Sequence, residues 1–95
     1  MVSSLVHHRV GDYDAWKRVY DSVEGVQREG GVRSHRVWRT NDDPNMVVVE
    51  HSFDDLAAAQ SFFDNPDLRR AMTDAGVDMS SFRIEFLDET AGGSF

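Results

Sequence analysis

The stretch VRSHRVWRTNDDPNMVVVEHSF, residues 32–53, decides the fold of this chain of 95 residues. Its two arms are rich in valine and aromatic residues, which favour β-strands. Between the arms, Asn41-Asp42-Asp43-Pro44-Asn45 is a dense signal for a turn. The stretch therefore predicts two strands, Val32–Thr40 and Met46–Phe53, which the Thr40–Asn45 loop joins as a hairpin.

A helical region is predicted on each side of this hairpin. Before it, Asp12 is a plausible N-cap and Gly30-Gly31 end the helix. After it, Asp54-Asp55 begin a second helical region, Asn65-Pro66 start a further helical piece, and Gly76 ends that piece. The apolar stripe of the first region, with steps of three and four, consists of Tyr13, Trp16, Val19, Tyr20, Val23 and Val26.

The outer segments complete the pattern as strands. Val2–Val10 is rich in Val, Leu and His, and Ser81–Leu87 alternates with a period of two. The order β-α-β-β-α-β predicts a ferredoxin-like α+β fold, with antiparallel strands in the order 4-1-3-2 and the helices on one face. We expect one domain over residues 1–90 and a flexible tail over residues 91–95.

The open face of this sheet predicts a homodimer. In one register it carries Trp38, Met46 and Val48, and a small monomer rarely leaves so much apolar surface in water. A second copy packed sheet to sheet would cover it, which gives a dimeric α+β barrel.

Composition excludes several classes of protein. Asp plus Glu is 17 and Lys plus Arg is 10, for a net charge of −7, which disfavours nucleic acid and anionic membranes as partners. Cysteine is absent, so disulfides, thiol nucleophiles and cysteine-held clusters are excluded. The segment Met1–Arg9 lacks the features of a signal peptide, and the longest apolar run, Met46–Val49, is too short to span a membrane. We therefore expect a cytoplasmic protein.

Several short motifs resemble those of a known superfamily. His8-Arg9-Val10, Asp12-Tyr13 and Trp16-Lys17 are similar to the opening of small dimeric α+β barrel proteins. Asp42–Asn45 resembles their hairpin, and Pro66–Val77 resembles their "PDLR-x-AM-x-x-AGV" segment. These proteins, often described as cyclases, belong to the superfamily of the antibiotic biosynthesis monooxygenases.

The resemblance runs from about Val6 to Leu87 and implies the same fold and dimer. The superfamily includes cofactor-free oxygenases, polyketide cyclases, haem-degrading enzymes and proteins with no known reaction. The fold alone does not show which of these functions a member has. Its haem-degrading members use a helical histidine, and neither predicted helical region contains one.

All four histidines, His7, His8, His35 and His51, fall in predicted strands. Neighbouring strand residues point to opposite faces, so one of His7 and His8 faces the space between the paired sheets. The apolar neighbours of His8 favour a position on the helix side, whereas the resemblance favours His8 as the functional residue. One hypothesis is a histidine base with a pKa near neutral pH. The alternative is a set of structural histidines with backbone partners.

Charged and aromatic strand residues are further candidates. If Phe82 and Phe86 pack against the helices, Arg83 and Glu85 face the cavity with Glu50, as an intersubunit ion-pair network or as part of a ligand pocket. Arg36 and Trp38 share one face, where they either stack on a flat oxygenated ring or, as we favour, form dimer contacts.

Metal and other cofactors are not expected. The histidines and Glu50 meet the ligand count, but they lack H-x-E-x-H or H-x-x-x-H spacing. No phosphate-binding loop or dinucleotide fingerprint occurs.

The favoured hypothesis is a cyclase or cofactor-independent monooxygenase acting on an aromatic or polyketide-like substrate by histidine-assisted proton abstraction. The predicted catalytic residues are His7, His8 and Arg83, with Arg36 as an alternative anion partner. The predicted substrate-binding residues are Arg36, Trp38, Glu50, His51 and Glu85. Two alternatives are a non-catalytic protein of the same fold that binds a small organic ligand, and a purely structural dimer.

Overall fold

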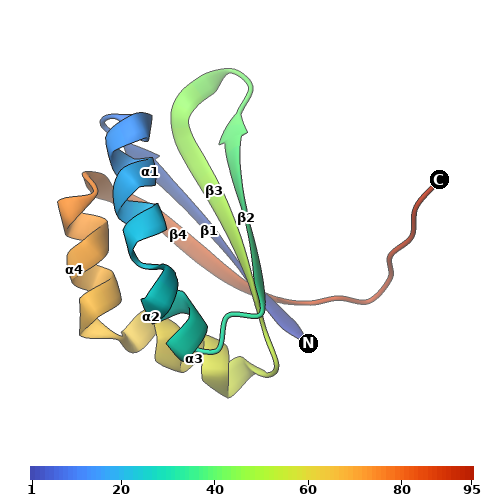
Figure 1. Ribbon diagram of the computed structural model, residues 1–95. Helices are drawn as coiled ribbons and strands as arrows, with labels where there is room; N and C mark the ends of the chain where they lie inside the picture. Colours follow the sequence, from blue (N-terminus) through green and yellow to red (C-terminus); the bar gives the residue numbers. More distant parts are fainter.

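A computed structural model describes all of residues 1–95. Eight elements follow one another along the chain (Figure 1): β1 (Val2–Val10), α1 (Tyr13–Ser22), α2 (Glu24–Glu29), β2 (Ser34–Thr40), β3 (Asp43–Phe53), α3 (Leu56–Asp64), α4 (Pro66–Asp74) and β4 (Val77–Asp88). Two helices make up each predicted helical region. None of them has the length and apolar character needed to cross a membrane.

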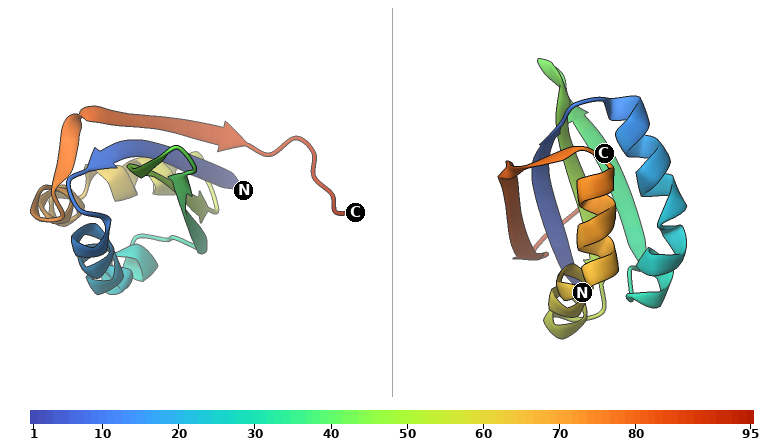
Figure 2. Two further views of the ribbon diagram at one scale, coloured as in Figure 1. Left: turned by 90° about the horizontal axis from the view of Figure 1, so that it is seen from above. Right: turned by 90° about the vertical axis from the view of Figure 1, so that its left-hand side faces the viewer.

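The four strands form one antiparallel sheet in the order β2-β3-β1-β4. Read from the other edge, this is the predicted order 4-1-3-2, so the predicted ferredoxin-like α+β fold is confirmed. Figure 2 shows the helices gathered on one face of the sheet and no element on the other. The last residues of the chain extend away from this two-layer body (Figure 1).

The first helical region was predicted as one helix, which is wrong. α1 ends at Ser22, and Val23, with φ −99° and ψ 18°, separates it from α2. The Ser22 hydroxyl donates to the Val19 carbonyl at 2.6 Å, a local bond that competes with helical geometry. The region still ends as predicted, because Gly31 takes the left-handed conformation with φ +88°.

The hairpin between β2 and β3 is tighter than predicted. Pairing resumes at Asp43, so only Asn41 and Asp42 form the turn. The Thr40 hydroxyl donates to the Asp43 carbonyl at 2.8 Å. Pro44 lies at a register shift just inside β3, where its missing N–H breaks no regular ladder.

Two strands differ from their predicted bounds at the start. β2 begins at Ser34 rather than Val32, because the Val32 N–H donates to the Gln27 carbonyl at 3.0 Å. β4 begins at Val77 rather than Ser81. The first difference arises from a local bond at the end of α2, and the second from the pairing of Val77 with Val10 of β1.

A bulge in β4 lies beside His8 of β1. The residues on either side of His8 pair with Arg83 and with Asp78 of β4. Residues 79–82 therefore lie opposite His8 alone. Bulges of this kind re-aim side chains and are frequent next to functional sites.

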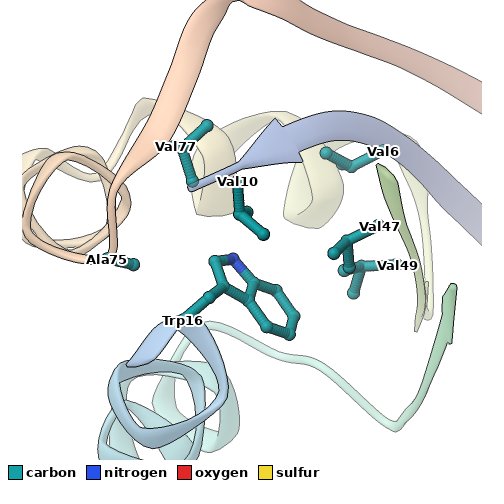
Figure 3. Close-up of a cluster of buried hydrophobic side chains, with 7 residues drawn as sticks. All are labelled: Val6, Val10, Trp16, Val47, Val49, Ala75 and Val77. Carbon is teal, nitrogen blue, oxygen red and sulfur yellow. The ribbon is translucent and has the colours of Figure 1, made fainter. Parts of the chain in front are cut away.

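The main core forms where α1 and the end of α4 meet the sheet. Trp16, with 4% of its surface exposed, is its largest side chain, and it lies among the valines of three strands (Figure 3). The cluster consists of Val6, Val10, Trp16, Val47, Val49, Ala75 and Val77. A second cluster, around Phe53 and Phe62, fills the other end of the layer.

Candidate functional site

A cavity of about 50 Å³ lies between the sheet and the helices. Eleven of its 14 lining residues are hydrophobic, and the other three are His8, Gln27 and His51. A space of roughly 10–15 Å³ holds one water molecule, so this cavity holds a few waters or a small group of a larger ligand.

An open groove of about 590 Å³ adjoins the cavity, between β4 and the helices α3 and α4. Phe63 and Met72 line both spaces and therefore form the wall between them. Met72 has a flexible side chain, whereas Phe63 is packed against other aromatic rings. The groove carries one charged pair, Asp64 and Arg69, whose side chains approach to 3.7 Å.

His8 lies at the β1 side of the cavity. Its ring centroid is 5.6 Å from that of Trp16, and it stacks on Phe82 of the bulge at 6.4 Å with an interplanar angle of 16°. The side chain is buried, and neither ring nitrogen has a hydrogen-bond partner. Burial, with a smaller effect of nearby His7, lowers the pKa of His8 to about 4. The ring is therefore neutral at pH 7.

His51 lies on β3 in a similar environment. It is buried, its Nδ1 has no partner, and its Nε2 lies 3.5 Å from Nε2 of Gln27. Burial, with a smaller effect of His35, lowers the pKa of His51 to about 4. Its cross-strand neighbour Ser4 also has a buried hydroxyl without a partner. Four unpartnered polar atoms thus belong to three buried residues of the sheet.

The pKa expected for a catalytic strand histidine is not found in either cavity histidine. A strand histidine was expected to supply a base with a pKa near 7. His8 and His51 instead have a pKa of about 4, because the apolar layer disfavours the charged imidazolium. Each ring is present in its neutral, proton-accepting form at pH 7, but it is a weak base.

Six of the eight predicted site residues lie on the opposite, open face of the sheet. They are His7, Arg36, Trp38, Glu50, Arg83 and Glu85. Arg36 lies 3.5 Å from Glu50. Glu85 lies 3.7 Å from Arg83 and 3.8 Å from His7. Ion pairs this exposed stabilise a single chain little.

An arginine was expected beside His7 or His8, and in the fold one lies beside His7 and none beside His8. Neighbouring strand residues alternate between faces, so His8 lies on the helix side and His7 on the open side. His7 is the cross-strand neighbour of Arg83, whereas no arginine lines the cavity with His8 and His51. Any anion in the cavity must therefore be stabilised by neutral donors.

No group of three or more His, Cys, Asp or Glu side chains is arranged to hold a metal ion. The two cavity histidines lie at different positions along the sheet, since His8 pairs with Val47 and His51 pairs with Ser4. On β1 the two positions concerned, His8 itself and Ser4 opposite His51, are four residues apart, which corresponds to roughly 13 Å.

Several solved structures have a fold similar to that of this chain. A candidate antibiotic biosynthesis monooxygenase from Deinococcus radiodurans has a TM-score of 0.75 at 15% identity, over 100% of this chain and 98% of that chain. SnoaB, a cofactor-independent oxygenase from Streptomyces nogalater, has a TM-score of 0.70 at 18% identity, over 98% and 94% of the chains. A candidate antibiotic biosynthesis monooxygenase from Bordetella bronchiseptica reaches 0.81 at 7% identity, over 95% and 97%.

The chain has the fold of the antibiotic biosynthesis monooxygenase-like proteins. The expected resemblance is thereby confirmed at the level of fold, which is what identities this low show. The sequence matches no protein-family model, and it matches no curated protein.

Two residues of the cavity, Tyr20 and Gln27, were not predicted from the sequence as site residues. Tyr20 was assigned only to the apolar stripe, and Gln27 was not singled out. The signal for Gln27 was present, because it follows Tyr20 by seven residues and Val23 by four, and so occupies a position of the buried stripe. A polar residue at such a position requires a partner, and in the fold that partner is His51.

Proposed function

We propose that the protein is an enzyme of the cofactor-independent monooxygenase or cyclase type. In this proposal a small aromatic or polyketide-like substrate enters by the groove and reacts at the cavity, where a neutral histidine accepts its proton. One observation carries the proposal. His8 and His51 are buried at an apolar cavity with ring nitrogens that no protein group satisfies.

Unpartnered polar groups in a buried position destabilise a fold by about 1–3 kcal/mol each. A purely structural layer would be more stable with leucine or phenylalanine at these positions. Two such histidines at one cavity therefore favour a ligand-binding role over a structural one, because a polar ligand atom would supply the missing partners.

The proposed chemistry needs few protein groups beyond one neutral imidazole. A phenol, or a carbon acid beside a carbonyl, gives a proton to a neutral imidazole nitrogen, which leaves the substrate anion and an imidazolium. In oxygenation, a CH₂ group and O₂ become a carbonyl and a water molecule, and the substrate supplies the electrons. In cyclisation, the carbanion attacks a carbonyl of the same molecule, whose oxygen then takes the proton from the imidazolium.

The neighbouring fold supports the oxygenase form of the proposal. SnoaB is described as a cofactor-independent oxygenase, and the cavity here has neither a metal-holding group nor a charged side chain in its wall. An apolar pocket suits both a flat ring and O₂. Activation of O₂ would then depend on the substrate anion itself.

A homodimer is part of this proposal. The open face carries apolar side chains beside the charged ones, namely Leu5, Trp38, Met46, Val48 and Leu87. Trp38 is 55% exposed in the single chain. A second copy packed on this face would bury it and would desolvate the ion pairs, which then fix the register of the two sheets.

The alternative is a small-ligand-binding protein without catalysis. One observation favours it: no arginine or lysine lines the cavity to hold a developing anion. Binding without proton transfer needs only the apolar walls and the hydrogen-bonding nitrogens. The two functions differ in whether a bound compound is consumed.

The test is a thermal-shift screen of small phenols, hydroxynaphthalenes and 1,3-diketones, followed by product analysis and O₂ consumption for each hit. We expect a compound that binds and is consumed, with turnover falling by about 10²–10⁴-fold in His8→Ala or His51→Ala, the usual contribution of a proton-transferring group. Arg18→Ala, on the exposed side of α1, is the control. His7→Ala tests a base on the open face.

If both cavity variants turn over a hit at the rate of the parent, the histidine mechanism is wrong. If compounds bind and none is consumed, the ligand-binding alternative replaces the enzyme.

A further inference from the structure

We propose that Gln27 is a positioning residue that holds His51 in the tautomer with its proton on Nδ1, so that His51 offers a hydrogen-bond donor to an oxygen atom of the ligand. The inference rests on the proposed ligand site in the cavity. It adds a role for a residue outside the expected site, and it gives the two histidines different tasks.

The contact between Gln27 and His51 carries the argument. Gln27, on α2, is 4% exposed, and its amide Nε2 lies 3.5 Å from Nε2 of His51. An amide nitrogen only donates, so His51 must accept at Nε2. Because a neutral imidazole carries one proton, that proton is then on Nδ1.

Tyr20 lines the same cavity as Gln27 and His51. The Tyr20 hydroxyl lies 2.7 Å from Nδ1 of His35, which is exposed. Tyr20 therefore has a partner of its own, and the side-chain amide of Gln27 has His51 as its partner.

The orientation of the Gln27 amide sets the tautomer of His51. With the amide nitrogen towards His51, as in the structure, Nε2 of His51 accepts the hydrogen bond. The opposite orientation would turn the amide oxygen towards Nε2, which would then carry the proton. The tautomer of His51 therefore distinguishes the two orientations.

The consequence is an unpartnered N–H at the cavity wall. Nδ1 of His51 has no protein partner, so an acceptor must come from a ligand or from water. A carbonyl or an anionic phenolate or enolate oxygen fits this donor, and a neutral imidazole can serve as such an electrophile. Both nitrogens of His8 are free, so His8 retains an accepting nitrogen for the proton of the substrate.

The test is ¹⁵N NMR of the full chain with labelled histidine rings at pH 7, because the two tautomers differ in their ring-nitrogen shifts. We expect His51 as the Nδ1–H form in the parent. In Gln27→Leu we expect its major form to change to Nε2–H, the form that free histidine prefers.

Two controls separate positioning from loss of structure. Ser4→Ala removes the hydroxyl opposite His51, which is not bonded to it, and should leave the tautomer of His51 unchanged. The tautomer of His8 should stay the same in all variants. If Gln27→Leu does not fold, Gln27→Asn, which withdraws the amide by one methylene group, replaces it.

Finding His51 as Nε2–H in the parent would overturn the proposal, and so would an unchanged tautomer in the folded Gln27 variant. Neither result depends on a substrate. Failure of the tautomer proposal is therefore distinguishable from failure of the proposed function, which the turnover of the cavity variants decides.

Discussion

His8 lies with its ring centroid 5.6 Å from that of Trp16, and nothing in the protein bonds to either of its nitrogens. The two side chains come from β1 and α1 and meet at the wall of the cavity. An apolar neighbour of this size keeps water from the imidazole, so the geometry that packs the core also keeps His8 neutral.

The stability of the protein should fall between pH 6.5 and pH 4. In the unfolded chain histidines bind protons near pH 6.5, whereas folded His8 and His51 stay neutral until about pH 4. The unfolded state therefore binds more protons in this window, and stability is lost as the pH falls. At about 1.4 kcal/mol for each pKa unit, the fall from 6.5 to about 4 makes each histidine account for up to about 3.5 kcal/mol.

Urea unfolding at several pH values measures this dependence. His8→Leu and His51→Leu should each flatten the curve by about half. The carboxylates with a lowered pKa, Asp43, Asp54 and Asp78, titrate below 3.8 and act outside this window. A constant free energy of unfolding from pH 6.5 to 4.5 would contradict the burial of the two rings.

Trp16→Ala should destabilise the fold by roughly 3–5 kcal/mol, the usual range for removal of a buried aromatic side chain. Trp16 is 4% exposed and touches the valines of three strands. The measurement is chemical denaturation followed by circular dichroism, with Leu56→Ala as the control, because Leu56 is 45% exposed. An unchanged midpoint for Trp16→Ala would mean that the helix face is misassigned.

The protein should be a dimer at micromolar concentration. Light scattering should give about twice the chain mass of 10.8 kDa. Val48→Asp should give monomers, because Val48 lies on the open face between His7 and Trp38 and a buried, unpaired charge is expensive there. Ala57→Asp, on the exposed surface of α3, should leave the mass unchanged. A parent protein of monomer mass would refute the dimer.

Two glycine substitutions should have opposite signs. Gly76→Ala should destabilise the fold by about 1 kcal/mol, since Gly76 has φ +79° at the end of α4 and an L-residue is strained there. Gly25→Ala should be stabilising by up to about 1 kcal/mol, because an added Cβ on α2 meets no atom within 4 Å and alanine favours helix. Thermal melts of the two variants check this prediction. Equal shifts in the melting temperature would contradict the backbone conformations assigned to Gly76 and Gly25.

Local signals were enough to predict the order of the elements. Asp12 caps α1 by accepting from the Asp14 N–H at 3.0 Å, and Asn65 caps α4 ahead of Pro66. These features act over a few residues, so a single sequence displays them. Val6 and Val10, on either side of His8, likewise favoured the helix-side position of His8 without deciding it, because a strand has a period of two.

The site was predictable only in part, because its distances arise from segments far apart in the chain. His51 and Gln27 are separated by 24 residues, and no local pattern pairs them. The separation of His8 from the arginines followed from the strand period once the register was known. The choice between His7 and His8 had stayed open because the apolar neighbours of His8 and the resemblance favoured different residues.

The sequence by itself determined the four strands and two helical regions, their order, and the acidic, cysteine-free character of the chain. Tertiary structure alone decided the bulge beside His8 and the lowered pKa of the two cavity histidines. The reason is physical: caps, turns and periodicity depend on neighbours along the chain, whereas desolvation and strand register depend on neighbours in space.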